Sequence, residues 1–231
     1  QLFSKTKALI ENERRFTADA AHELRTPLAG IQAQVQVAQA ALSAENRGHA
    51  LAQALQGCQR ASHLIAQLLT LARLESNSVT CFETCDLQEL AKQQISALAP
   101  SALEQGVQLE LAEGQPVLIQ GLATLLEVLL RNLLDNAIRY TGAGTEVLVR
   151  ASYTDQQACL SVTDTGPGLA PDDLAKITER FYRPADTTAT GSGLGLSIVQ
   201  RIVELHAGSL QIQQGHYGRG LCVNIYFPIQ T

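Results

Sequence analysis

Apolar residues recur along the first third of the chain in a pattern that predicts two helices. From Leu24 to Leu42 they are spaced alternately four and three residues apart, which is the period of helices that pack side by side. A second run with this period extends from Leu51 to Ala72, and turn-forming residues 43–48 separate the two. We therefore expect an antiparallel hairpin of helices over residues 16–42 and 49–75. Residues 1–15 are either a helical lead-in or a frayed terminus.

Both apolar stripes are too wide for a single hairpin to bury. The second helix carries additional leucines at positions 64, 68, 71 and 74 beside its main stripe. Two hairpins that pair through these stripes would form a four-helix bundle, so we expect a homodimer.

The pattern changes after residue 76 to short strands alternating with shorter helices. This mixture is typical of an α+β domain. We expect a first domain of residues 16–75, a hinge at residues 76–79 and a second domain of residues 80–231. Strands are expected at 79–83, 107–111, 117–119, 146–152, 158–163, 209–213 and 221–227, and helices at 87–105 (with Pro100 inside it or breaking it), 122–140 and 194–206.

Composition narrows the class of protein. The formal net charge of −5 argues against a nucleic-acid partner, which requires a basic surface. Five cysteines without metal-ligand spacing indicate reduced thiols and a cytosolic setting. No apolar run reaches the roughly 18 residues of a membrane span. The chain begins with Gln1, so we interpret it as a piece of a longer protein.

One histidine on the first helix is a candidate for chemistry. His22 lies two residues before Leu24, on the side opposite the apolar stripe, and Glu23 follows it directly. Thr26 is four residues further and shares the face of His22. The alternative interpretation is a solvated surface pair without a role. His206 ends a helix, where a cation is favoured, and we assign it no chemistry.

Three later stretches could together form a nucleotide pocket. In RNLLDNAIRYT (residues 131–141), Asn132 and Asn136 share a helix face that Arg139 extends, which provides oxygen ligands for Mg²⁺ and a cation for phosphate. In DTGPG (residues 164–168), Asp164 can accept a hydrogen bond from an adenine amino group. The alternatives are solvated asparagines and an ordinary turn at the end of a strand.

The third stretch is GSGLGLSIV, residues 191–199, in which glycines open a helix. Free amides and the positive end of the helix dipole suit a polyphosphate, although the spacing matches neither a dinucleotide-binding fingerprint nor a P-loop. Before it, ERFYRP contains Phe181, which can anchor a loop on the core, and Arg183, which can reach a terminal phosphate. Residues 184–190 are expected to form a polar lid.

In this order and spacing, the motifs resemble those of the sensor histidine kinases of bacterial two-component systems. HELRTP is similar to their H box, and the later stretches to their N, G1, F and G2 boxes. The residues in and around these motifs are most similar to those of the quorum-sensing and polymyxin-resistance subgroup. The resemblance implies an all-α dimerisation and phosphotransfer domain followed by an α+β ATP-binding sandwich of the Bergerat (GHKL) type. It implies ATP contacts from Asn132, Asn136, Arg139, Tyr140, Asp164, Gly166, Gly168, Phe181, Arg183, Gly191, Gly193, Gly195 and Leu196.

The same resemblance implies a reaction. His22 would take the γ-phosphoryl group of ATP, with Glu23 as general base and Asn136 holding Mg²⁺. The phosphoryl group would pass to an aspartate of a response regulator, and Thr26 would orient a water for dephosphorylation of that partner. The parent protein would be a bacterial inner-membrane sensor anchored upstream of Gln1, with this chain as its cytoplasmic portion.

Two other classes of protein remain alternatives. One is a binding module that uses ATP as a conformational switch, and the HELRTP stretch argues against it. The other is a non-catalytic dimerising scaffold, against which the intact asparagine and glycine motifs argue. The sequence leaves open whether phosphorylation occurs within one protomer or between two.

Overall fold

The computed structural model describes residues 2–75, 82–154, 156–184, 191–215 and 219–229, with side chains for residues 17–74 of the first range and for all of the later ones. The chain divides into two compact units, residues 1–73 and 74–231. The proposed hinge at 76–79 and most of the lid at 184–190 lie outside the described residues.

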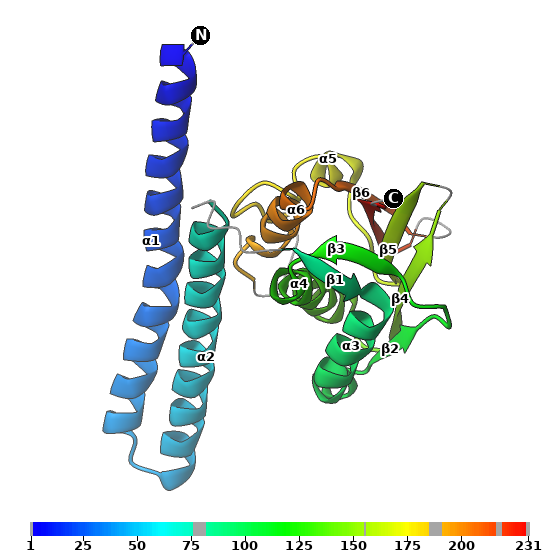
Figure 1. Ribbon diagram of the computed structural model, residues 1–231. Coiled ribbons are helices and arrows are strands. Elements are labelled where there is room, and N and C mark those ends of the chain that lie inside the picture. The colour runs from blue at the N-terminus through cyan, green and yellow to red at the C-terminus, as the bar shows by residue number, and fades with distance from the viewer. Residues whose placement is uncertain (1, 76–81, 155, 185–190, 216–218, 230–231) are drawn as a thin grey trace. The chain divides into compact units, whose positions relative to one another are not determined.

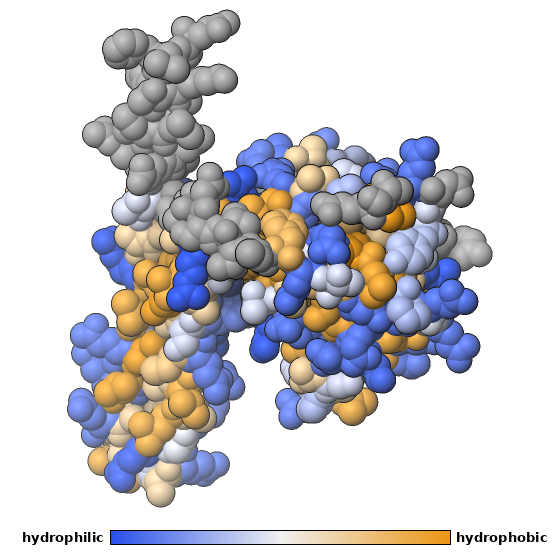
Figure 2. All heavy atoms as spheres, viewed as in Figure 1, coloured by the Kyte–Doolittle hydropathy of each residue, from blue (hydrophilic) through white to orange (hydrophobic). Residues whose placement is uncertain are grey.

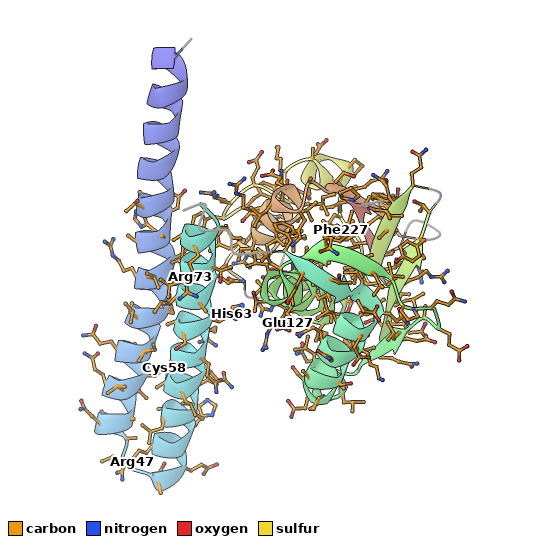
Figure 3. The ribbon with its side chains drawn as sticks, in the orientation of Figure 1. Arg47, Cys58, His63, Arg73, Glu127 and Phe227 are labelled. Atoms are coloured by element: carbon orange, nitrogen blue, oxygen red, sulfur yellow. The ribbon has the colours of Figure 1, made fainter. Side chains whose placement is uncertain are left out.

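The first unit is a hairpin of two long helices (Figure 1). Helix α1 (Leu2–Ala40) includes Pro27, and α2 (Ala44–Glu75) follows after three residues. The Ser43 hydroxyl accepts the Asn46 N–H at 3.1 Å, which caps α2. The Arg47 guanidinium donates to the Ala41 carbonyl at 3.2 Å and lies at the foot of the hairpin (Figure 3). The expected break between the two helices is present but lies at residues 41–43 instead of 43–48, because this cap starts α2 at Ala44 instead of His49.

The two columns of the apolar stripe on α1 have different surroundings. Ala38 is buried, and Leu24 and Ile31 are half-buried. The other column, Leu28, Val35 and Leu42, is exposed. A Cβ on Gly57 of α2 would stand 2.6 Å from Ile31 Cγ1, so the Ile31 side chain of α1 packs against the backbone of α2 at this glycine. On α2, Ala50, Ala54, Ala61 and Leu64 are buried, whereas Leu51, Leu55, Ile65 and Leu69 are exposed.

The second unit contains a five-stranded mixed sheet with the order β2-β4-β5-β7-β6. Strands β2 and β4 are parallel, and the remaining neighbours are antiparallel. Strands β1 and β3 form a separate antiparallel pair. The elements are β1 (Glu83–Asp86), α3 (Leu87–Glu104), β2 (Val107–Leu111), β3 (Leu118–Gly121), α4 (Ala123–Thr141), β4 (Thr145–Tyr153), β5 (Gln157–Asp164), α5 (Pro171–Leu174), α6 (Gly195–Leu205), β6 (Ser209–Gln214) and β7 (Leu221–Pro228).

Helices α3, α4 and α6 cover one face of this sheet, which makes the unit a two-layer sandwich (Figure 1). Alternate residues of the strands supply one side of the core, as the two-residue period requires. Phe227 of β7 is 1% exposed and lies among packed side chains between the layers (Figure 3). The helices contribute the fully buried side chains of Leu126, Leu129 and Leu130 from α4 and of Ile198 and Ile202 from α6.

Most predicted elements of this unit are present, with two corrections. The first strand is Glu83–Asp86 instead of 79–83, because Cys85 pairs with Ile119 and has a buried side chain. The short helix α5 was not predicted. Pro100 lies inside α3, whose first turn is capped by Asp86 accepting the Gln88 N–H at 3.0 Å.

The cysteines for which the structure describes a side chain are free thiols. Cys85 and Cys159 are buried, and burial raises the pKa of both thiols. Cys222 is half-buried and Cys58 is exposed. Within the described part of the chain, no helix is both long enough and apolar enough to cross a membrane.

His206 corrects a further expectation. Its imidazole is 4% exposed at the end of α6, between the rings of Phe82 and Phe227. Nδ1 lies 2.7 Å from the Ile202 carbonyl, and Nε2 accepts the Leu122 N–H at 3.0 Å. An imidazole that donates at Nδ1 and accepts at Nε2 is neutral. Burial also lowers the pKa of His206, so a cation is disfavoured at this helix end.

Candidate active site

The first part of the candidate site is the exposed histidine of α1. His22 and Thr26 are exposed, and Glu23 is half-buried beside them. The Thr26 hydroxyl donates to the His22 carbonyl at 3.3 Å, so the two residues share one helix face as predicted. Pro27 has no N–H, which removes the donor that the Glu23 carbonyl would otherwise have in the helix. The imidazole is thus accessible to a reactant and has a carboxylate next to it in the chain.

The second part is the polar face of α4. Asn132 is 9% exposed, and its Nδ2 donates to the Val128 carbonyl of the preceding turn at 2.8 Å. This bond orients the side-chain oxygen away from the helix axis. Asn136 lies one turn further and is half-buried, while Arg139 and Tyr140 are exposed. Arg131 points elsewhere and pairs with Asp135 at 3.7 Å.

The glycine cluster packs directly on this face. A Cβ at Gly195, the first residue of α6, would lie 3.1 Å from Asn136 Nδ2 and 3.2 Å from Asn132 Oδ1. A Cβ at Gly191 would collide with the Tyr140 hydroxyl and lie 3.5 Å from an Arg139 guanidinium nitrogen. Glycine is therefore required here because the backbone must approach the side chains of α4.

The backbone at the beginning of α6 has a geometry that suits an anion. Gly193 has a φ of +69°, and Ser192 Oγ accepts the Leu194 N–H at 3.2 Å. Leu194 and Leu196 are buried and hold the helix end on the core. The amides of the first turn and the positive end of the helix dipole lie beside the amide side chains of Asn132 and Asn136. This arrangement fits a polyphosphate.

Asp164 ends β5 and begins the turn that closes the site. Its Oδ1 accepts the Gly166 N–H at 2.8 Å. Burial raises the pKa of the Asp164 carboxyl, while hydrogen bonds from the backbone of Gly166 and Leu221 act in the opposite direction. A Cβ at Gly166 would lie 2.8 Å from Thr141 Cα, so the turn packs on the last turn of α4. A partly desolvated carboxylate at this place can accept a donor from a base.

The residues around Phe181 contact the same glycine cluster. The Phe181 N–H donates to the Gly193 carbonyl at 2.9 Å. Phe181 has a φ of +62°, and a Cβ on Gly193 would lie 2.6 Å from the Phe181 carbonyl carbon. Arg183 follows two residues later and is exposed.

The structure therefore brings Asn132, Asn136, Arg139 and Tyr140 together with the glycine cluster. It places Asp164 and Gly166 against the end of the same helix, and Phe181 against Gly193. His22 belongs to the other unit. Contacts with this site from His22 or Arg183 stay predictions.

Sequence reasoning missed two residues of the site. Thr141 forms the wall on which Gly166 packs, and its membership of the 131–141 stretch was the available signal. Gly220 closes the 164–168 turn: its N–H donates to the Gly166 carbonyl at 2.7 Å, and a Cβ on Gly168 would lie 2.9 Å from its oxygen. Its partners are far away in sequence, so no local pattern indicated it.

The candidate oxygen ligands for a cation at this site are the side-chain amides of Asn132 and Asn136. Among the described residues no group of three or more His, Cys, Asp or Glu side chains is placed to hold a metal ion. The Asn136 side-chain oxygen beside the start of α6 is a hard ligand, which fits Mg²⁺ shared with a phosphate.

Comparison with known families agrees with this geometry. Residues 12–77 match the family described as "His Kinase A (phospho-acceptor) domain". Residues 121–231 match the family described as "Histidine kinase-, DNA gyrase B-, and HSP90-like ATPase". The chain therefore belongs to the sensor histidine kinases, as its motifs predicted.

Individual relatives place it within that family. The sensor protein kinase PmrB of Pseudomonas aeruginosa is 40% identical over 229 residues, which is 98% of this chain and 48% of PmrB. The sensor protein QseC of Escherichia coli K12 is 42% identical over 223 residues, 94% of this chain and 48% of QseC. The predicted subgroup is confirmed. The chain spans about half the length of these curated relatives.

Solved structures support the fold. The histidine kinase AdeS of Acinetobacter baumannii has a TM-score of 0.73 and 25% identity, covering 91% of this chain and 98% of that one. Full-length ShkA in complex with AMPPNP has a TM-score of 0.66 and 32% identity, covering 95% of this chain and 46% of that one. The expected helical hairpin followed by an α+β ATPase domain is confirmed.

Proposed function

We propose that this chain transfers the γ-phosphoryl group of ATP to His22 and then to an aspartate of a response regulator. The observation that carries the proposal is the packing of Gly195, the first residue of α6, on Asn132 and Asn136. This packing supports a polyphosphate site in a chain that also exposes His22 on a helix, beside Glu23. The family and the AMPPNP complex of ShkA support the use of ATP.

In this proposal the candidate site residues of the second unit bind different parts of the nucleotide. Asp164 accepts a hydrogen bond from the adenine amino group, and Gly166 and Gly168 let the backbone approach the base. Arg139 and Arg183 bind phosphate, Tyr140 flanks the nucleotide, and the amides at Gly191, Gly193, Gly195 and Leu196 hold the phosphate oxygens. Asn136 would hold Mg²⁺, which supplies positive charge between the phosphates.

His22 acts as nucleophile. A lone pair of the neutral imidazole forms the N–P bond, the bond from the γ-phosphorus to the bridging oxygen breaks, and ADP leaves. The imidazole proton passes to Glu23, its neighbour on α1. The phosphoryl group then moves to the carboxylate of the regulator. In the opposing reaction, dephosphorylation of the regulator, Thr26 orients the water that hydrolyses the regulator's acyl phosphate. The Thr26 hydroxyl lies on the same helix face as His22.

The hairpin is proposed to work as a homodimer. Leu51, Leu55, Ile65 and Leu69 of α2 are exposed in heptad register, and Leu28 and Val35 of α1 are exposed in the same way. Figure 2 shows apolar residues gathered along the visible side of the hairpin. An exposed stripe of this length is typical of an interface, and a second copy would bury it in a four-helix bundle.

The relatives are sensors of about twice this length. We propose that the parent protein is an inner-membrane sensor, anchored upstream of Gln1, and that this chain is its cytoplasmic portion. Direct binding of nucleic acid is not part of the proposal, since the net charge is −5.

The test is incubation with Mg²⁺ and γ-labelled ATP, beside His22→Gln and Asn136→Ala variants. We expect acid-labile label on the wild-type chain and none on either variant. Label that survives His22→Gln would move the acceptor elsewhere, and acid-stable label would indicate a serine or threonine kinase. ATP binding without labelling would favour a nucleotide-dependent switch.

A further inference from the structure

The backbone at Phe181 is held in a conformation that bulky residues rarely adopt. A φ of +62° is uncommon for an aromatic residue, and such a conformation persists only where several contacts impose it. On one side the contact is the Phe181 N–H bond to the Gly193 carbonyl at 2.9 Å. Gly193 itself has a φ of +69° and admits no side chain against Phe181.

On the other side the contact is made by the next residue, Tyr182. Its hydroxyl donates to Asp173 Oδ1 at 2.6 Å. A hydroxyl bond to a carboxylate at this distance belongs to the strong, charge-assisted class. The bond to Asp173 raises the pKa of the Tyr182 hydroxyl, because the carboxylate accepts the proton that ionisation would remove. Asp173 lies on the short helix α5, which has no side-chain cap of its own.

We propose that Tyr182 and Asp173 are positioning residues of the nucleotide site. Their hydrogen bond anchors the segment after Phe181 to α5, while Gly193 anchors it to the glycine cluster. With both anchors in place, the backbone keeps its positive φ, Gly193 stays beside the start of α6, and Arg183 leaves the segment in a fixed direction. The inference rests on the proposed function, because Arg183 and the glycine amides are assigned to phosphate there.

Loss of the Tyr182 anchor has a defined consequence. Phe181 can then relax to a negative φ, which changes the direction of the chain on both sides of it. The nucleotide must select the original conformation from a mixture, so apparent affinity falls by the fraction of chains that retain it. An interaction equal in the bound and transition states affects KM and leaves kcat unchanged. A bond that only stabilised α5 would instead lower the melting temperature and leave the KM of the folded protein intact.

The experiment compares Tyr182→Phe, Asp173→Ala and the double variant with the wild-type chain in ATP-dependent autophosphorylation. Tyr226→Phe removes a hydroxyl that lies 3.5 Å from Gln211 on the sheet, and Asp172→Ala removes the neighbouring carboxylate of α5, so these are the matched controls. We expect the KM for ATP to rise about tenfold to a hundredfold in both single variants, as loss of a charge-assisted hydrogen bond predicts. The double variant should be no worse than the stronger single one, because both remove the same bond.

Further outcomes separate the alternatives. The melting temperature without nucleotide should match that of the controls, and Asp173→Asn, which keeps an acceptor oxygen, should recover part of the KM. A wild-type KM in Tyr182→Phe, or additive effects in the double variant, would overturn the positioning role while leaving the proposed function standing. A wild-type chain that neither binds ATP nor becomes labelled would overturn both.

Discussion

The hairpin and the ATP-binding unit use their apolar residues in opposite ways. Within the hairpin, Ile31 of α1 packs against Gly57 of α2, while Leu55 and Leu69 remain more than half exposed. In the ATP-binding unit, large residues such as Leu130, Ile198 and Phe227 are almost completely buried between sheet and helices. Burial of apolar area is the main driving force of folding, so the second unit has a core of its own and the hairpin requires an additional surface.

The largest expected effect comes from a charge in the exposed stripe of the hairpin. Leu69→Asp places an unpaired carboxylate from each copy in the proposed interface. The dissociation constant of the dimer should rise at least about a hundredfold, equivalent to roughly 2.7 kcal/mol, as sedimentation would measure. ATP affinity should not change.

The matched control is Leu103→Asp, since Leu103 is a 76% exposed leucine on α3 of the other unit. It should leave both dimerisation and ATP affinity unchanged. A Leu69→Asp chain that dimerises as tightly as the wild type would remove the exposed stripe from the interface.

The next effect is confined to the ATP-binding unit. Leu130→Ala truncates a fully buried side chain and should cost this unit about 2–5 kcal/mol in its free energy of unfolding. Denaturant titration, with nucleotide binding as the signal for the folded state, measures this free energy of unfolding. The hairpin should still dimerise. Leu103→Ala should change stability by less than about 0.5 kcal/mol. Simultaneous loss of the dimer would mean that the two units do not fold independently.

Two glycines sharpen the comparison further. Gly195→Ala puts a methyl group against Asn132 and Asn136 and should weaken ATP binding about tenfold, since overpacking typically costs about 1–3 kcal/mol. Gly30→Ala on α1 meets no atom within 4 Å and should stabilise the hairpin by up to about 1 kcal/mol through helix propensity. Isothermal titration and thermal melts measure the two effects. Equal ATP affinity in both variants would contradict the proposal that the close packing of Gly195 on Asn132 and Asn136 forms part of the ATP site.

The smallest expected effect is a pH dependence at His206. Its pKa in the folded chain is lowered by burial, so unfolded chains bind more protons and acid favours unfolding. The stability that neutral His206 contributes is fully present above the ordinary histidine pKa of the unfolded chain. It is lost as the pH falls through that pKa toward the lower pKa of the folded chain. We therefore expect the free energy of unfolding to fall between neutral and mildly acidic pH.

Melting curves of the wild type and His206→Gln at several pH values test this. The variant should show a flatter profile, whereas His49→Gln, which changes an exposed residue of α2, should keep the wild-type profile. An unchanged slope in His206→Gln would assign the pH dependence to other groups.

The sequence predicted those features that depend on local periodicity. Strand β2 has its expected bounds, the β4–β5 and β6–β7 hairpins pair as expected, and Asn132 and Asn136 share one face of α4. These features repeat every two or four residues, so a short window of sequence contains the whole signal.

The features that were wrong or missed depend on partners far away in the chain. The position of β1 is set by pairing with β3, and the neutral state of His206 by Leu122, a residue 84 positions earlier. The start of α2 was local but ambiguous, because residues 43–48 are turn formers and Ser43 is also a good helix cap. The bond between Tyr182 and Asp173 spans only nine positions, but it needs the unpredicted helix α5.

The bond between Leu122 and His206 has a mechanical consequence. It ties the beginning of α4 to the end of α6, while Gly195 at the beginning of α6 rests on the middle of α4. The two helices of the proposed polyphosphate site are therefore fastened to each other at two separated points and should move as one stiff body. Backbone amides of both helices should then exchange with deuterium together, and the Leu122 amide should be protected until the whole unit opens.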